Sequence, residues 1–255
     1  MIRFNKISKS VLRTFLVIIG CFLLLFKNSV YAEPNDQQRQ VFLVLEKQID
    51  RGNSEGIRQK IVDLDGYPLH AYLWYKWLKK NLYLNADIEA FQRQYSNTRY
   101  AKPLRTRQMT YFAQQQQWYA VINNYRIGDG NSQQCLYYWA LYKTGQKSQA
   151  MQGAASLWVN GYSLPDACDA LLKVYKVSSF LTSEVNWQRF QAALKNRKPG
   201  LAKYLKRFFS QDNIKVADQW LATHNNPSRV SNCYRWDYKM PQAALIFSHG
   251  IHRLA

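Results

Sequence analysis

Acidic residues are the first candidates for chemistry in this chain of 255 residues, which carries only 16 Asp and Glu against 35 Lys and Arg. A carboxyl group with a raised pKa can act as a general acid, and two facing carboxyl groups can hydrolyse a glycosidic bond. Glu55, Glu89 and Glu184 stand apart from any Gly-rich or Ser-rich pocket motif and resemble solvated helix residues. Asp63 and Asp65 would point to different sides of a helix, and a helix terminus explains them better. We therefore assign no catalytic residue.

Histidines and glycine motifs offer no stronger candidate. Of the four histidines, only His249 and His252 would share a helix face, and no third ligand accompanies them, so we expect a surface pair and not a metal site. The sequence contains no Gly-rich phosphate loop, nucleophile elbow or dinucleotide fingerprint. We predict neither a metal nor a cofactor.

The N-terminal 32 residues have the pattern of an export signal. Four basic residues precede an apolar run over 15–26, and small residues end at Ala32, where we expect cleavage. An uncleaved anchor or a lipoprotein signal at Cys21 are the alternatives. The apolar run is short for a membrane span, which argues against the anchor. Processing at Cys21 would leave an apolar N-terminus, which argues against the lipoprotein signal. We therefore expect a periplasmic protein without a stable membrane anchor after cleavage.

The formal net charge indicates which classes of molecule the protein could bind. Cleavage after Ala32 removes five basic and no acidic residues, which lowers the formal charge from +19 to +14. A basic surface often binds nucleic acid, but an exported protein meets anionic envelope polymers and lipids instead. A dispersed charge that only keeps the protein soluble is the simpler alternative. We predict no nucleic-acid partner.

Cysteines carry information about the compartment. The predicted mature chain, residues 33–255, keeps Cys135, Cys168 and Cys233, which permits one bridge and one free thiol. Cys135 and Cys168 lie on predicted helices of one local group. We pair these two, because an oxidising periplasm allows the bond to persist.

The apolar residues repeat with helical spacing, and no stretch alternates like a strand. A helical hairpin is predicted from apolar positions 135–142 and 150–158, with a turn at Thr144-Gly145. Further helical patterns cover 168–175, 187–194 and 201–208. Breaks between helices of about 10 to 16 residues are expected at Tyr67-Pro68, Lys102-Pro103, Gly161 to Pro165, Lys198-Pro199-Gly200 and Asn226-Pro227.

Helices of this length cannot bury an apolar face alone, so successive hairpins must stack on their neighbours. Ala140, Gly145 and Ala150 are typical of a tetratricopeptide hairpin, although no strict 34-residue repeat continues elsewhere. We therefore predict an all-α fold over residues 33–255. Its architecture would be an irregular right-handed α-superhelix, a tetratricopeptide-like solenoid of helical hairpins.

Two sequence blocks resemble one protein family. Tyr67-Pro68-Leu69 with Tyr72-Leu73-Trp74-Tyr75 is similar to the YPLxxYLxY stretch of soluble lytic murein transglycosylases. The run from Gln134-Cys135 to Ala167-Cys168-Asp169 resembles their QCxYYxAxxxTGQ…LWxxGxSxPxACD block. The resemblance covers the chain from about Asp36 to its last helix. It implies the family's N-terminal superhelical U-shaped region and a disulfide between Cys135 and Cys168.

The same resemblance implies a reaction that this chain is not expected to perform alone. The family cleaves the β-1,4 bond between N-acetylmuramic acid and N-acetylglucosamine and forms 1,6-anhydro products, with one glutamate as the acid in a C-terminal lysozyme-like domain. Neither that domain's Glu-Ser pair nor its GLMQ segment occurs here, and 247–255 falls in an apparent helix. We expect a region truncated at its C-terminal side that binds or positions peptidoglycan strands.

Two other functions remain open. A tetratricopeptide-like scaffold would bind cell-wall synthesis or envelope proteins, and a fragment would have no role of its own. Most tryptophans are expected to fill the core and a minority to stack on sugar rings. The expected core set is Trp74, Trp77, Trp139, Trp158 and Trp187.

Overall fold

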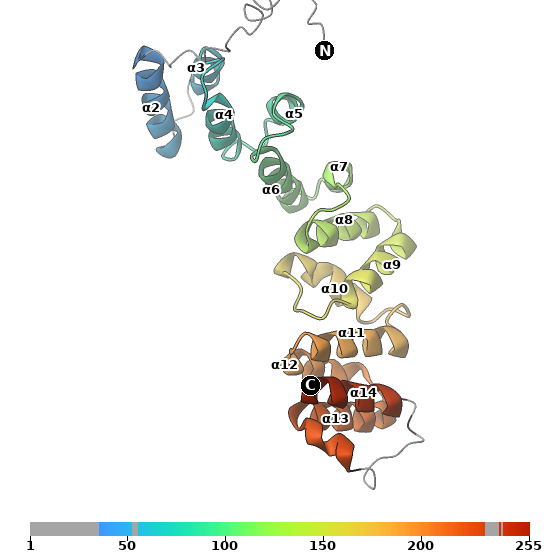
Figure 1. Cartoon of the computed structure of the whole chain (residues 1–255). Helices are drawn as coiled ribbons and strands as arrows, with labels where there is room; N and C mark the ends of the chain where they lie inside the picture. Colours follow the sequence, from blue (N-terminus) through green and yellow to red (C-terminus); the bar gives the residue numbers. More distant parts are fainter. Residues whose placement is uncertain (1–35, 53–55, 233–239, 241) are drawn as a thin grey trace, which may run out of the picture. The chain divides into compact units, whose positions relative to one another are not determined.

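The structure is a computed structural model that describes residues 36–52, 56–232, 240 and 242–255, and all regular elements among them are helical (Figure 1). The all-α prediction is confirmed. The predicted signal peptide, Glu55 and Cys233 lie outside the described residues. Among the helices that are described, none combines the length and apolar character that a bilayer span needs. The chain divides into two compact units, residues 1–77 and 78–255.

Three helices form the described part of the first unit: α2 (Asp36–Asp50), α3 (Ile57–Val62) and α4 (His70–Leu78). The buried residues of α2 are spaced three and four apart, so one stripe faces the core, while the exposed faces carry polar residues together with Val41, Leu43 and Val44. Asp63 caps the C-terminal end of α3, and Asp65 lies in the turn that follows. The predicted helix terminus at these two carboxylates is confirmed.

The first sequence block supplies packing and an ion-pair cluster in this unit. The buried Tyr67 ring stacks on Phe42 with centroids 5.1 Å apart. Tyr72 donates a hydrogen bond of 2.6 Å to Glu46, which also accepts one of 2.9 Å from the buried Lys76. These contacts join α4 to α2, so the block is explained by packing within the unit.

The second unit is a row of short helices in which chain neighbours pack side by side (Figure 1). Its α-helices are α5 (Asn85–Gln94), α6 (Ala101–Gln114), α7 (Trp118–Asn124), α8 (Asn131–Lys143), α9 (Lys147–Trp158), α10 (Asp169–Tyr175), α11 (Ser183–Lys195), α12 (Pro199–Leu205), α13 (Gln211–Asn225) and α14 (Ala243–Leu254). The described residues between them include three 3₁₀ turns: η1 (Asp166–Cys168), η2 (Lys206–Phe208) and η3 (Pro227–Ser231). From α6 to α13 the buried apolar residues of each helix pack against those of neighbouring helices, which confirms the stacking predicted from sequence, whereas Phe247, Ile251 and Leu254 of α14 are exposed.

The α8–α9 hairpin forms where the sequence predicts it. Gly145 occupies the turn with a φ of +93°, a conformation that glycine adopts without steric cost. Ala140 and Ala150 are both fully buried, Ala140 in a cluster with Met109, Phe112 and Val121 and Ala150 in the cluster that continues toward α13. A Cβ on Gly153 would lie 2.1 Å from Cε1 of Tyr138, so glycine allows α9 to approach that ring. Small residues therefore set the close packing of this hairpin.

The helix lengths differ from the prediction. Several helices have only six or seven residues, because 3₁₀ turns and loops interrupt the expected longer elements. The break expected at Lys102-Pro103 is wrong: α6 begins at Ala101 and includes the proline. Proline is tolerated there because the first helical turn makes no intrahelical N–H bond. The break at Pro199 does mark the first residue of α12.

Most of the tryptophans assigned to the core are buried. Trp77, Trp158 and Trp187 are between 1% and 5% exposed, whereas Trp74 and Trp139 are half-buried. Trp139 stacks on Tyr142 of the same helix with ring centroids 5.3 Å apart. This pair leaves an aromatic surface on α8 that is partly open to solvent.

Candidate functional site

A hollow of about 650 Å³ lies against α5, α6 and α7, and we call it the amide groove. Its floor contains Ile88, Phe112 and Ala120, of which the first two are almost fully buried. Its walls are rich in side-chain amides and cations. The polar lining residues are Asn85, Glu89, Gln92, Arg93, Arg105, Gln108, Gln117, Asn123, Asn124 and Arg126. An apolar floor below a ring of amides suits a ligand with one hydrophobic face and polar edges.

Gln108 is the buried polar residue of the amide groove. It lies on the inward stripe of α6, four residues from both Leu104 and Phe112, and only 4% of it is exposed. Its Nε2 donates a hydrogen bond of 3.0 Å to Oδ1 of Asn85, and no described residue donates one to its Oε1. An amide oxygen can accept hydrogen bonds, so this atom can accept one from a ligand. The sequence analysis missed Gln108, although a polar residue within an apolar stripe was the available signal.

A buried ion pair braces one wall of the amide groove. Arg105 donates two hydrogen bonds, of 2.6 and 2.8 Å, to the carboxylate of Asp129, and a third of 2.7 Å to the backbone oxygen of Asn124. The Asp129 side chain is 1% exposed, and its carboxylate also accepts a hydrogen bond of 3.0 Å from the backbone N–H of Arg126. Hydrogen bonds from Arg105, opposed by burial, hold the pKa of Asp129 below its usual value. The guanidinium is thereby fixed in a position that lines the groove.

Other side chains of the amide groove are held by backbone atoms. Gln92 donates to the oxygen of Ala101 at 2.8 Å, and Asn124 donates to that of Ala120 at 3.0 Å. Each amide keeps its own oxygen available as an acceptor on the wall. Among the described lining residues, Glu89 alone carries a carboxyl group, and it is exposed. The arrangement offers hydrogen bonds to a neutral polar ligand and contains no pair of facing carboxylates.

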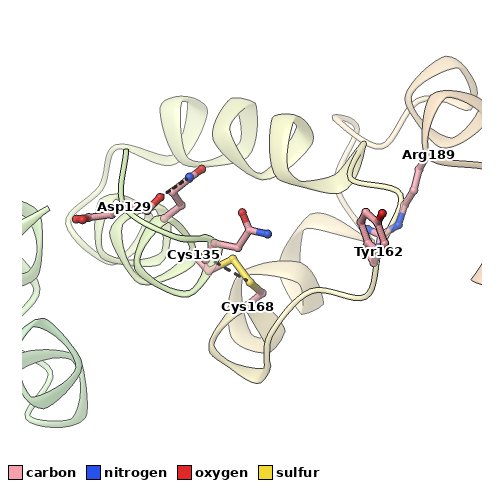
Figure 2. Close-up of a disulfide and its surroundings, with 7 residues drawn as sticks. Asp129, Cys135, Tyr162, Cys168 and Arg189 are labelled. Atoms are coloured by element: carbon pink, nitrogen blue, oxygen red, sulfur yellow. Dashed lines mark hydrogen bonds between the residues drawn. A yellow bond between two sulfur atoms is a disulfide. The ribbon is translucent and has the colours of Figure 1, made fainter. Parts of the chain in front are cut away.

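A disulfide braces the helices that follow. It joins Cys135 of α8 to Cys168 of η1, the pair named in the sequence analysis, with a Cα to Cα distance of 4.8 Å (Figure 2). Both residues are fully buried. Gln134, next to Cys135, donates a hydrogen bond of 2.9 Å to the backbone oxygen of Asp129. The second sequence block therefore ties α8 both to the loop that carries Asp129 and to η1.

A glycine of the same block permits a close backbone contact. A Cβ on Gly161 would lie 2.5 Å from the backbone oxygen of Ala192 and 2.3 Å from Nδ2 of Asn196. The loop after α9 thus touches the C-terminal end of α11 directly. Only the absence of a side chain at this position allows that contact.

The remaining predicted candidates do not come together. Glu184 is exposed in the first turn of α11, where it accepts a hydrogen bond from Gln188. No three His, Cys, Asp or Glu residues in the described part of the chain are grouped as metal ligands.

The expected surface pair of His249 and His252 is wrong. His249 faces α13, where its Nε2 lies 2.9 Å from Nδ1 of His224, and the two rings stack 5.2 Å apart. Burial, followed by repulsion from His224, lowers the pKa of His249 to about 4. Sequence spacing could not show which histidine of α14 turns toward α13.

Comparison with known proteins gives one consistent result, although no protein-family model matches the sequence. The chain is 28% identical over 240 residues to the soluble lytic murein transglycosylase of Escherichia coli K12, which covers 91% of this chain and 37% of that protein. The Salmonella typhimurium protein of the same name is 28% identical over 218 residues, and this match covers 84% of this chain and 34% of that protein. The chain thus spans little more than a third of the length of these relatives.

Solved structures give the same result. The 70-kDa soluble lytic transglycosylase of Escherichia coli matches with a TM-score of 0.70 and 25% identity, over 87% of this chain and 36% of that one. An inactive mutant of lytic transglycosylase Slt from Pseudomonas aeruginosa matches with a TM-score of 0.74 and 25% identity, over 84% of this chain and 35% of that one. The resemblance predicted from the two sequence blocks is confirmed, in sequence and in fold.

Proposed function

We propose that this chain, as a relative of the soluble lytic murein transglycosylases, binds and positions peptidoglycan glycan strands. The observation that carries the proposal is the likeness in sequence over 91% of the chain, together with the shared fold. We further propose that the chain corresponds to the superhelical region of those proteins and provides a scaffold for strand binding. A tetratricopeptide-like scaffold for protein partners has less support, because the relatives found by sequence and by structure are transglycosylases.

The amide groove has the chemistry that a glycan strand requires. The sugars of peptidoglycan carry acetamido groups and hydroxyl groups around rings whose C–H faces are apolar. Side-chain amides of the groove can donate to and accept from these groups, while Phe112 and Ile88 offer an apolar floor. Arg93 adds an exposed cation that can attract the carboxylates of stem peptides. We assign the amide groove as a contact site for the glycan strand.

The compartment is part of the same proposal. We propose export to the periplasm with cleavage after Ala32, which would leave residues 33–255 as one α-superhelical region. The buried disulfide supports an oxidising compartment, since such bonds persist there and are rare in the cytosol. Glycan strands are present in that compartment. N-terminal sequencing of the exported protein would identify the processing site.

A pull-down with purified sacculi tests the binding function. Arg93→Gln and Gln108→Met should each weaken retention, by about three-fold to ten-fold for one lost polar contact. Arg107→Gln and Gln152→Met are matched controls, because both residues are exposed and lie outside the amide groove. Retention should also fall with ionic strength. Wild-type retention that neither salt nor the groove variants change would rule out this mode of binding.

A muropeptide assay separates binding from cleavage. We expect no 1,6-anhydro products when the purified chain is incubated with sacculi, because the reaction needs a general acid held against the glycosidic oxygen, and Glu89, the carboxyl group among the described lining residues of the amide groove, is exposed. Adding the chain to an active transglycosylase from another source provides the positive control. Robust release of anhydro products by the chain alone would contradict the assignment of a binding scaffold.

A further inference from the structure

A buried arginine in the second unit has almost no polar partners. Arg189 lies on α11 among the apolar residues of its stripe, and only 4% of it is exposed. Its Nη2 donates one long hydrogen bond of 3.3 Å to the backbone oxygen of Tyr162 (Figure 2). Its Nε and Nη1 are buried without any hydrogen-bond partner among the described residues. Five N–H groups therefore share a single acceptor.

The surroundings of Arg189 do not supply a counter-charge. No described carboxylate forms an ion pair with it, and its guanidinium instead lies 4.2 Å above the ring of Trp158. Burial lowers the pKa of Arg189 to about 10, against weak opposition from the hydroxyl groups of Tyr204 and Tyr175. A buried cation without an anion is costly, and a ring face offsets only part of that cost. This position can therefore gain stability from an incoming anion.

Arg189 borders a cavity that is large enough for a small ligand. The cavity has a volume of about 380 Å³ and lies between the loop after α9, the end of α10, and helices α11 and α12. Trp158, Leu172, Leu201 and Tyr204 form an apolar wall. At the edge, the half-exposed Lys176 makes no ion pair with a described residue. Two cations beside an apolar wall suit an anion that carries a short apolar group.

We propose that this cavity binds the terminal carboxylate of a short peptide. The guanidinium of Arg189 would turn from Tyr162 and hold the carboxylate through two charge-assisted hydrogen bonds, with Lys176 as a second cation. A methyl group next to the carboxylate would pack against Leu201 and Tyr204. For the source of the peptide, the inference rests on the proposed function, because the stem peptides of peptidoglycan end in D-alanine. The site would hold a stem peptide while the amide groove holds the glycan.

Calorimetric titration of the full chain with N-acetyl-D-alanyl-D-alanine tests the site. This probe should bind about ten-fold or more tightly than the same dipeptide with its C-terminus amidated, because only the carboxylate can pair with the guanidinium. Arg189→Gln should remove that preference. Arg207→Gln is the matched control, since this exposed arginine lies above the outer part of the same wall, 4.0 Å from the Tyr204 ring centroid. A preference that survives Arg189→Gln would overturn the inference.

A second variant protects the test against misfolding of Arg189→Gln. Gly200 lines the cavity at an exposed position, and a Cβ there meets no atom within 4 Å, so Gly200→Phe should place a ring at the cavity without displacing a neighbouring atom. This variant should abolish binding of the dipeptide while its thermal unfolding stays close to that of the wild type. Full binding to a folded Gly200→Phe protein would show that the dipeptide binds elsewhere, which overturns the inference.

Two further probes separate the sources of the anion. Inorganic phosphate that binds as tightly as the dipeptide would overturn the assignment to a carboxylate. Equal binding of N-acetyl-L-alanyl-L-alanine would overturn the assignment to the cell wall and leave a site for peptide C-termini in general. If sacculi bind and the dipeptide does not, the inference fails while the proposed function stands. The reverse result would retain the cavity site and reject glycan binding.

Discussion

The disulfide between Cys135 and Cys168 allows a prediction of how much one bond contributes to stability. The bridged residues lie 33 positions apart in sequence. The loop-closure relation for the unfolded chain gives about 3.7 kcal/mol for a loop of this length at 25 °C. Both cysteines are fully buried, so replacement by alanine leaves only small voids and no unpaired hydroxyl group. We therefore expect the variant with alanine at both positions to lose about 3–4 kcal/mol of unfolding free energy.

Urea unfolding of the oxidised wild type and of this double variant measures the loss. With a slope of about 2 kcal/mol per molar urea, the midpoint should fall by about 1.5–2 M. Dithiothreitol should lower the wild-type midpoint by the same amount and leave the double variant unchanged. Cys233→Ala is the control for a general effect of losing a thiol. A reduced wild type that unfolds within about 0.5 kcal/mol of the oxidised protein would refute the loop-closure reasoning.

Substitutions at three other sites, one of them paired with a control at Gly200, have defined outcomes. Asp129→Ala should destabilise the chain by about 2–3 kcal/mol in urea unfolding, because it removes two charge-assisted hydrogen bonds and leaves the partly buried Arg105 with one backbone acceptor. The wild-type contribution of this pair should be present above about pH 4 and be lost as the pH falls through the lowered pKa of Asp129. Gly161→Ala should cost about 2–3 kcal/mol through its backbone contact, whereas Gly200→Ala, in open space, should cost almost nothing in the same assay. The pKa of His249 is about 4 in the folded chain, below its unfolded value, so protonation of the unfolded state should lower Tm as the pH falls from about 6.5 toward 4. His249→Gln should reduce that fall, and an identical pH profile of Tm would contradict the assignment.

The helical row could be predicted because its cause is local. Apolar residues at helical spacing define each stripe, and short stripes need neighbours to cover them, so fold class and stacking follow from the sequence. The turn at Gly145 and the pairing of Cys135 with Cys168 were also predicted, since both lie within one local group of helices. Helix ends were predicted less well. Pro103 shows why, because the same residue can end one helix or open the next.

Contacts between helices could not be predicted from spacing. His249 and His252 are three residues apart on α14, but the partner of His249 is on α13, 25 positions earlier in the chain. The groove formed by α5, α6 and α7 likewise depends on how three helices lean on one another, which the periodicity of each helix does not fix. Sequence patterns identify which face of a helix is buried. They do not identify which side chain of a neighbouring helix packs against that face.

Polar residues within buried stripes were the signal that remained unused. Gln108, Arg189 and His224 each occupy a position where the helical spacing predicts an apolar side chain. Burying such a group costs free energy unless a partner offsets it. His224 has the ring of His249, and Gln108 has an amide partner for one of its two polar atoms. Arg189, which has a ring face and one long hydrogen bond, is the least compensated of the three, and it borders a cavity. Since a bound anion would offset most of the remaining cost at this position, the cavity beside Arg189 is where ligand binding should stabilise the fold most.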